Sequence, residues 1–460
     1  MMRKIEDILN EQKIFGVLEK TKNPNPKEVG TILDKASKKQ GLRLEEIGYL
    51  TNCDNLKLVE KMFETARKIK EDIYGERLVF FAPLYVSNFC VNDCDYCGFH
   101  RRNPAPRKKL ALKEVEEQVK ILENMGHKRL LLEFGEHPTE NPIDYVTDVI
   151  KTIYNTKYGR GEIRRVNVNI AATSVENYKK LKEAGIGTYQ LFQETYHRPT
   201  YEKLHHGPKA DYERQLFAHD RAFEADIDDV GLGVLFGLYD WRFEVLAIVS
   251  HAQYLEKKFG VGPHTLSVPR WKPAEGVNWQ SAPYPVSENE LIKIIAILRM
   301  AVPYTGMIIS TREGPEIRAK AFEIGISQTS AASRTSPGGY GRKGKLCQFS
   351  VADHRPIDQV IKSILKQGLL PSFCTACYRL GRTGHDFMNF AKPGDIQNFC
   401  RPNGILTFKE YLEDYASKAV KKAGKQIINQ YLKKIPDTQI KQKTLRRLEK
   451  IHQGERDLYF

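Results

Sequence analysis

The feature that most constrains the fold of this chain is a regular alternation of strand-like runs with amphipathic helical stretches. Eight runs have the composition of buried strands, and they cover residues 78–87, 129–136, 165–172, 188–196, 229–238, 264–270, 306–312 and 326–333. A helix-length stretch follows each run, and the last of these is PIDQVIKSILKQG. Eight such repeats predict an α/β fold of the TIM type, a (β/α)₈ barrel. A doubly wound open sheet is the alternative.

The rest of the 460 residues is expected to form helical extensions on both sides of this barrel. Residues 1–75 carry apolar positions at helical spacing, as in LKLVEKMFETARKIKEDIYG. We therefore expect three parts, namely an N-terminal helical extension over 1–75, the barrel over 76–369, and a C-terminal helical extension with cysteines over 370–460.

Three cysteines lie within eight positions directly after the first predicted strand. They are Cys90, Cys94 and Cys97 in SNFCVNDCDYCGFH, a CxxxCxxC spacing. Three thiolates on a four-iron cluster leave one iron without a protein ligand, and such an open position is where a substrate or cofactor binds. A zinc site that recruits His100 as fourth ligand is the alternative. Because strand-to-helix loops form the functional face of such barrels, the triplet is predicted to lie there.

A second cysteine triplet opens the C-terminal extension. Cys374 and Cys377 form a CxxC pair, and Cys400 follows after 22 residues. This group again suits an iron–sulfur cluster with one open iron, and a Cys₃His zinc site using His385 is the alternative. Because the preceding helix runs antiparallel to the strands, the second triplet should begin at the opposite mouth of the barrel.

Composition narrows the class of protein and its compartment. No apolar run approaches the roughly 20 residues that span a bilayer, and the start lacks the apolar stretch of a secretory signal, so we expect a cytoplasmic protein without a membrane partner. The eight cysteines would stay reduced there, which favours metal ligation over disulfides. Of the net charge of +15, +9 falls between Lys418 and Lys450, with 11 basic and two acidic residues. This segment is interpreted as solvated amphipathic helices or as a docking surface for an acidic partner; no nucleic-acid motif accompanies it.

The spacing of the first triplet, with Tyr96 before its last cysteine, resembles the radical S-adenosylmethionine (SAM) superfamily. The resemblance implies that Cys90, Cys94 and Cys97 are catalytic ligands of a [4Fe-4S] cluster whose open iron chelates SAM. Cleavage of SAM then gives a 5′-deoxyadenosyl radical. The resemblance further implies cofactor contacts from Tyr96, from Gly135 and Glu136 in EFGEHP, and from Asn169 in RVNVNIAATS.

Several longer stretches narrow the resemblance. FCTACYRLGRTGHDFM, FQETYHR and GVGPHTLSVPR are similar to the HydG family, the tyrosine lyases of [FeFe]-hydrogenase maturation. This similarity implies that L-tyrosine is cut at Cα–Cβ into p-cresol and dehydroglycine, and that dehydroglycine becomes carbon monoxide and cyanide. A second [4Fe-4S] cluster on Cys374, Cys377 and Cys400 would collect both on an additional labile iron held by His264. The implied partners are a reductant such as ferredoxin or flavodoxin and the hydrogenase maturation proteins.

The substrate contacts are less clearly marked. Thr329 and Ser330 precede AASRTSPGGY, at the positions where some HydG sequences have an isoleucine–aspartate pair. This local sequence is closer to that of ThiH, the tyrosine lyase of thiazole biosynthesis. We expect Ser333 and Arg334 to bind the tyrosine carboxylate, with Arg270 as the alternative. Two other functions stay open, a ThiH-like lyase that releases dehydroglycine and a non-catalytic metal or scaffold protein.

Chain direction predicts where the two sites lie. A strand of seven residues in such a barrel spans roughly 19 Å, so clusters at opposite mouths should be more than about 20 Å apart. A fragment passing between them needs a route through the lumen, and Asn167, Gln193 and Glu194 are the polar side chains expected to line it.

Overall fold

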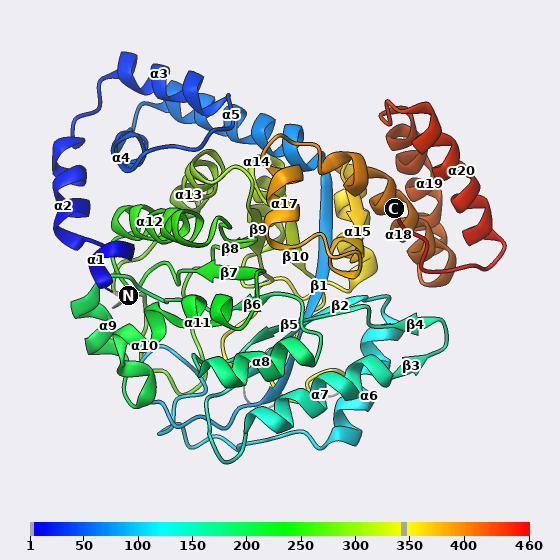
Figure 1. Ribbon diagram of the computed structural model, residues 1–460, viewed down its shortest axis with the longest axis horizontal. Helices are drawn as coiled ribbons and strands as arrows, with labels where there is room; N and C mark the ends of the chain where they lie inside the picture. Colours follow the sequence, from blue (N-terminus) through cyan, green and yellow to red (C-terminus); the bar gives the residue numbers. More distant parts are fainter. Residues whose placement is uncertain (1–3, 342–346) are drawn as a thin grey trace.

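A closed barrel of parallel strands forms the centre of the molecule (Figure 1). The computed structural model describes residues 4–341 and 347–460. Eight strands form the ring, in the order β1 (Arg77–Ser87), β2 (Arg129–Phe134), β5 (Arg165–Asn169), β6 (Tyr189–Gln190), β7 (Val230–Gly233), β8 (Thr265–Ser267), β9 (Gly306–Ile309) and β10 (Gln328–Ser330). Because β10 pairs with β1, the ring is closed. The predicted barrel is therefore confirmed, and the open sheet is excluded.

Strand β1 is the longest strand and has neighbours along its whole length. Its middle pairs with β10, and its second half, from Ala82, pairs with β2. Its first three residues pair with an additional strand, β11 (Leu370–Ser372), on the edge that β2 occupies farther along. All but the first residue of β1 are buried, as expected for a parallel strand covered on both faces.

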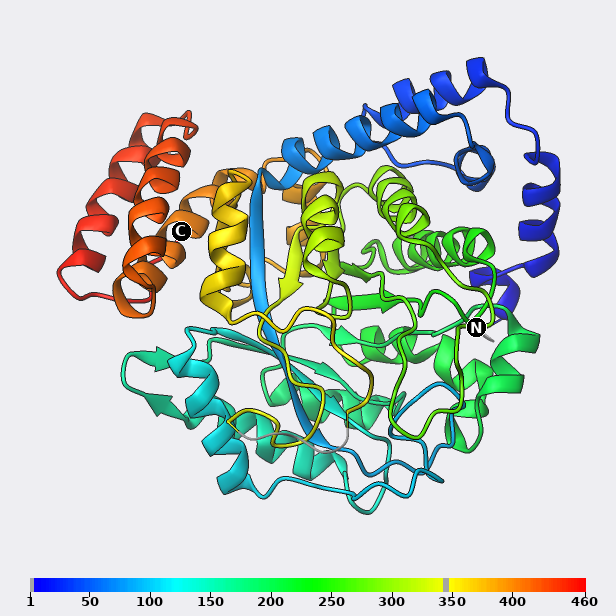
Figure 2. The ribbon, with the colours of Figure 1, turned by 180° about the vertical axis from the view of Figure 1, so that it is seen from behind.

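The helices that follow the strands cover the outside of the barrel (Figures 1 and 2). They are α6 (Leu112–Asn124), α7 (Ile143–Asn155), α8 (Val175–Glu183), α12 (Trp241–Phe259), α13 (Glu288–Ala301), α14 (Pro315–Ile324) and α15 (Ile357–Lys366). After β6 the chain forms short pieces in place of one long helix: α9 (Arg198–Leu204), η1 (Pro208–Ala210), α10 (Tyr212–Leu216) and α11 (Ala218–Glu224). Gly207, at φ 91°, and Pro208 interrupt the helix here. A small antiparallel hairpin of β3 (Lys157–Tyr158) and β4 (Gly161–Glu162) was also not expected from the sequence.

The N-terminal helices extend over one side of the barrel (Figure 2). They are α1 (Ile5–Ile8), α2 (Glu11–Lys20), α3 (Pro26–Ala36), α4 (Leu44–Asn52) and α5 (Leu56–Tyr74). Helix α5 packs against α13 and α14, and α4 packs against α12 and α13. The buried ammonium of Lys70 on α5 donates a hydrogen bond to the carbonyl of Phe322, 2.5 Å away, and thereby joins this layer to α14.

The C-terminal helices begin at the amino-terminal mouth of the barrel, because β11 pairs with the start of β1. They are α16 (Ala376–Arg379), α17 (Gly384–Ala391), α18 (Gln397–Asp414), α19 (Lys418–Lys433) and α20 (Thr438–His452). Helices α19 and α20 pack on α18 and project to one side of the barrel (Figure 1). None of the helices in residues 4–341 and 347–460 is long and apolar enough to cross a membrane.

Candidate active site and a second cysteine site

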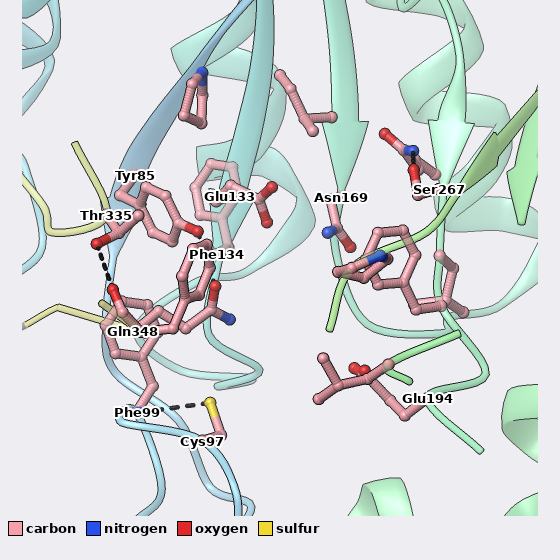
Figure 3. A pocket seen from close by; sticks show the side chains of 18 of the residues that line it. Tyr85, Cys97, Phe99, Glu133, Phe134, Asn169, Glu194, Ser267, Thr335 and Gln348 are labelled. Atoms are coloured by element: carbon pink, nitrogen blue, oxygen red, sulfur yellow. Dashed lines mark hydrogen bonds between the residues drawn. The ribbon is translucent and has the colours of Figure 1, made fainter. Parts of the chain in front are cut away.

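The first cysteine triplet lies in a cavity at the carboxyl-terminal mouth of the barrel, as predicted. Cys90, Cys94 and Cys97, all in the loop between β1 and α6, line this upper cavity together with residues near the ends of β1, β2 and β5 (Figure 3). This is the face on which barrel enzymes carry their active sites.

One hydrogen-bond donor lies near each of two of these sulfur atoms. The backbone N–H of Phe99 donates to Cys97 Sγ at 3.4 Å, and Asn92 Nδ2 lies 3.8 Å from Cys90 Sγ. Burial raises the pKa of Cys97 to about 11, so the free thiol is neutral at pH 7 and bound iron would have to displace its proton. Such donors stabilise negative charge on sulfur, as in an iron–sulfur site.

The turn after β2 brings backbone close to this loop. A Cβ atom on Gly135 would lie 2.3 Å from the carbonyl oxygen of Phe89, so only glycine fits there. The next residue, Glu136, lines the cavity, and its carboxylate accepts hydrogen bonds from Asn92 Nδ2 at 2.6 Å and Arg214 Nη2 at 2.5 Å. Both residues therefore lie where a cofactor bound beside the first triplet would contact them.

The other two predicted cofactor contacts also line the upper cavity. Tyr96 faces it, and its hydroxyl lies 2.8 Å from His205 Nε2. Asn169 ends β5 and lies opposite Glu133 in the ladder between β2 and β5 (Figure 3). All seven residues assigned to the first cluster and its cofactor are thus brought together.

Only one of the three predicted substrate residues lines the upper cavity. Ser333 lines the upper cavity, and its buried Oγ has no hydrogen-bond partner among the described residues. Arg334 is exposed, and its side chain donates to the carbonyl of Ser333. Arg270 donates to both carboxylate oxygens of Glu313 and to the carbonyl of Val286. Neither Arg270 nor Arg334 is among the lining residues of the cavity.

Three charged residues that line the cavity were missed at the sequence level, namely Lys209, Arg312 and Glu133. Arg312 follows β9 and forms no ion pair with any described carboxylate; its guanidinium lies 3.2 Å from the centre of the Phe349 ring. Glu133 lies on β2 and points into the cavity (Figure 3). Arg312 and Glu133 could have been found, because Arg312 ends a predicted strand and Glu133 lies in the carboxyl-terminal half of another.

The second triplet lines a separate cavity at the opposite mouth. Cys374, Cys377 and Cys400 share this lower cavity with His264, which directly precedes β8. The starts of β1, β2 and β10 contribute the remaining wall, which includes Arg77, Val79, Arg129 and Gln328. The predicted placement of the two triplets at opposite mouths is therefore confirmed.

Polar groups surround the second triplet as well. Arg77 Nη2 lies 2.9 Å from Cys400 Sγ, and the backbone N–H of Ala376 donates to Cys374 Sγ at 3.4 Å. The hydroxyl of Tyr378 lies 2.7 Å from His264 Nε2. Burial lowers the pKa of His264 to about 4, so its imidazole is neutral at pH 7, the form that binds metals.

The positions of His100 and His385 give little support to the two alternative zinc sites. Both ring nitrogens of His100 are engaged, with Asp93 Oδ1 at 3.0 Å and the carbonyl of Gly276 at 3.1 Å. His385 lies beside Gly260 and is not among the residues lining the lower cavity. In residues 4–341 and 347–460, no three side chains of His, Cys, Asp or Glu are grouped closely enough to share one metal ion. Thiolates that bind different irons of one cluster stand farther apart than ligands of a single zinc ion.

An apolar cluster forms part of the wall of the upper cavity. Phe81, Leu131 and Ile308 come from three strands and pack together there. Of the polar residues predicted to line a passage, Glu194 faces the upper cavity, where Lys209 binds it at 2.8 Å. Asn167 accepts a hydrogen bond from the backbone of Thr188, and neither Asn167 nor Gln193 lines either cavity.

Comparison with known proteins agrees with this geometry. Residues 84–247 match the Radical SAM superfamily, and residues 267–370 match the Biotin and Thiamin Synthesis associated domain. The 2-iminoacetate synthase of Salmonella typhimurium is 33% identical over 317 residues, which cover 68% of this chain and 82% of the relative. A crystal structure of HydG, a maturase of the [FeFe]-hydrogenase, is 56% identical, with a TM-score of 0.97 over 99% of this chain and 100% of that one. HydG from Carboxydothermus hydrogenoformans is 41% identical, with a TM-score of 0.86 over 97% of this chain and 100% of that one.

Proposed function

Because the chain belongs to the radical SAM superfamily, and within it to the HydG family, we propose that it cleaves L-tyrosine at Cα–Cβ and converts the two-carbon fragment to carbon monoxide and cyanide. The observation that carries the proposal is the content of the upper cavity. It holds three thiols, the Gly135 turn, the unpaired guanidinium of Arg312 and the unpartnered hydroxyl of Ser333.

The first three thiols would hold a [4Fe-4S] cluster, and SAM bound to it supplies a 5′-deoxyadenosyl radical when an electron arrives. The chain's part is to place one substrate hydrogen beside that radical and to exclude water. The loop with Cys90, Cys94 and Cys97, the Gly135 turn and Asn169 surround the cofactor position, because all of them line the same cavity. A low-potential protein such as ferredoxin or flavodoxin would provide the electron.

Arg312 and Ser333 would bind the carboxylate of tyrosine. Arg312 is a half-buried cation, and desolvation lowers its pKa, so an anionic ligand compensates for the water that it has lost. Ser333 Oγ has no hydrogen-bond partner among the residues that the structure describes, and it can donate to the same carboxylate. Loss of a hydrogen atom from the amino nitrogen then weakens Cα–Cβ, and the bond breaks to give dehydroglycine and a delocalised 4-hydroxybenzyl radical, which becomes p-cresol on gaining one electron and one proton.

The lower cavity extends the activity beyond that of a 2-iminoacetate synthase. Dehydroglycine contains the atoms of one carbon monoxide, one hydrogen cyanide and one water, so this conversion needs no oxidant or reductant. We assign the capture of carbon monoxide and cyanide to a second [4Fe-4S] cluster on Cys374, Cys377 and Cys400 with a labile iron at His264, for delivery to the hydrogenase maturation proteins. The neutral imidazole of His264 and the donors near the sulfur atoms support this assignment.

Product analysis tests the proposal. The anaerobically reconstituted protein should convert tyrosine to equal amounts of 5′-deoxyadenosine and p-cresol, with carbon monoxide and cyanide appearing more slowly. Iron analysis should give about eight to nine irons per chain, since two clusters contain eight irons and the labile site adds one. If dehydroglycine, detected as glyoxylate and ammonia, is the only second product, the chain is a ThiH-like lyase.

A further inference from the structure

Glu133 is a carboxyl group in the upper cavity that the steps above do not use. It lies on β2, two residues after Leu131 on the same face of the strand, and points into the cavity between Tyr85 and Asn169 (Figure 3). None of the described lysine or arginine residues forms an ion pair with it within 4.0 Å. A carboxyl group placed on the substrate side of an active-site cavity without its own cation is available to a ligand.

The groups that face Glu133 come from four other strands or their ends. Arg312 after β9 and the amide of Asn169 on β5 favour its charged form, whereas Glu194 after β6 disfavours it. Tyr85 on β1 is neutral, because burial and the charge of Glu133 raise its pKa. Glu133 and Arg312 therefore place an acidic and a basic group on the same cavity, and once Glu133 is ionised this arrangement is complementary to the zwitterion of an α-amino acid.

We propose that Glu133 is the base that accepts a proton from the ammonium group of the bound substrate, while Arg312 and Ser333 hold its carboxylate. This inference rests on the proposed tyrosine lyase function. The proton transfer converts R–NH₃⁺ and a carboxylate into R–NH₂ and a carboxylic acid, so charge and atoms balance. The neutral amine would then offer an N–H hydrogen atom to the 5′-deoxyadenosyl radical that bound SAM would supply, which would give 5′-deoxyadenosine and an aminyl radical on the substrate. Asn169, the implied ribose contact, lies beside Glu133, which places the amine next to the radical.

Burial of Glu133 and binding of the substrate carboxylate by Arg312 favour transfer of the ammonium proton to Glu133. Desolvation raises the pKa of Glu133 to about 8, whereas a carboxyl with its ordinary pKa of 4.5 would hold the proton of an ammonium group weakly. Arg312 opposes this shift in the free protein. When the substrate carboxylate neutralises Arg312, that opposition is removed, so binding of the carboxylate strengthens the base at the moment when the ammonium arrives.

The test compares Glu133→Gln with a matched buried carboxyl. Glu244 on α12 also has a pKa raised to about 8 by burial, but it binds Thr195 and the backbone of Tyr196 away from the cavity, so Glu244→Gln is the control. Loss of a general base predicts that p-cresol and tyrosine-dependent 5′-deoxyadenosine formation fall about 100-fold or more in Glu133→Gln, and less than about twofold in the control.

The pH profile provides a readout that a structural role would not change. Wild-type kcat/KM should rise with pH and level off above about pH 8, as Glu133 ionises. In Glu133→Gln this inflection should disappear, and the rate should keep rising until the substrate ammonium itself ionises. Glu133→Asp, which keeps a carboxylate, should retain an inflection and a partial rate. The affinity for labelled tyrosine, measured by equilibrium dialysis without turnover, should show the same inflection with pH in the wild-type protein. This inflection should be lost in Glu133→Gln.

Each outcome has one meaning. If the wild-type protein makes no p-cresol, the proposed function fails. If Glu133→Gln keeps the wild-type rate and pH profile, the base assignment is wrong while the function stands. If Glu133→Gln instead loses binding of labelled SAM, Glu133 is a cofactor ligand and the assignment is equally overturned. Should Glu133→Gln not fold, as judged by circular dichroism, the inflection of Glu133→Asp decides.

Discussion

At the scale of single residues, Gly135 illustrates how little space the upper cavity leaves. An alanine Cβ would meet Phe89 O at 2.3 Å and Cys90 Cβ at 3.1 Å, and both belong to the loop with the first triplet. We predict that Gly135→Ala displaces this loop, weakens SAM binding at least tenfold, and destabilises the fold by about 1–3 kcal/mol. Binding of labelled SAM and urea unfolding measure both effects. Gly314→Ala is the control, because no atom lies within 4 Å of its Cβ and its φ is negative.

A second residue, His127, links stability to pH. It is fully buried, neither ring nitrogen has a partner in the described structure, and desolvation lowers its pKa to about 4. The unfolded chain, with an ordinary histidine pKa of about 6.5, binds the proton first, so stability falls as pH decreases from 6.5 to 4. Between pH 7 and 5 this histidine alone should cost about 2 kcal/mol.

Urea unfolding at the two pH values checks this prediction. His127→Leu should remove about 2 kcal/mol of the pH dependence, whereas replacing the exposed His354 by glutamine should leave it unchanged. An unchanged slope for His127→Leu would show that the ring is protonated or solvated in the folded state.

The site residues differ in how far the sequence could predict them. The placement of the six clustered cysteines, Gly135 and Glu136 was predictable, because their spacing or local backbone geometry indicates where they lie. Arg270 and Arg312 both follow predicted strands, and only tertiary structure shows that Glu313 binds one guanidinium while the other faces the cavity. No local pattern in the sequence reports which partner a long, flexible side chain finds.

At the scale of elements, strand β1 connects the two sites. Side chains alternate along a strand, and the odd-numbered residues of β1 line first the lower cavity, with Arg77 and Val79, and then the upper one, with Phe81, Pro83 and Tyr85. Eight residues at about 3.3 Å each separate Arg77 from Tyr85 by about 26 Å along the strand. The expected cluster separation of more than about 20 Å agrees with this length.

This geometry predicts that a larger side chain in the lumen of the barrel changes the ratio of the products. Val79→Phe should narrow the route between the apolar cluster and the lower cavity, so p-cresol forms while carbon monoxide and cyanide fall about fivefold or more. Trapped dehydroglycine would leave at the upper mouth and hydrolyse to glyoxylate and ammonia, which can be measured. Leu78→Phe adds a phenyl ring to the opposite face of the same strand and should not change the product ratio. Equal ratios in both variants would argue for a route outside the barrel.

The elements were largely predictable, since all eight strands formed near their expected positions. The exceptions have physical reasons. The stretch after β6 breaks into short helices at Gly207 and Pro208, and the pairing of β11 with β1 depends on residues about 290 positions apart, which no local period can show.

At the scale of the whole molecule, the proposed function assigns two chemistries to two separate sites of one chain. Cys94→Ala should abolish tyrosine-dependent 5′-deoxyadenosine and p-cresol, because the radical is formed at the upper site. Cys377→Ala should keep at least about a third of the p-cresol but lose at least about 90% of the carbon monoxide and cyanide. Loss of all products in equal measure in a folded Cys377→Ala protein would show that the lower site is needed for substrate binding or structure.

The closure of the ring also has a consequence for synthesis of the protein. The edges of β1 find β10 and β11 only after roughly 250 and 290 further residues have been made. At 5–20 residues per second, a ribosome needs about 10–60 s for these residues. During that time the first three cysteines lie on a nascent chain whose first strand can pair with β2 but still lacks β10 and β11. The topology of the barrel therefore delays closure of the ring, and the lower site, which β11 leads into, is the last to be assembled.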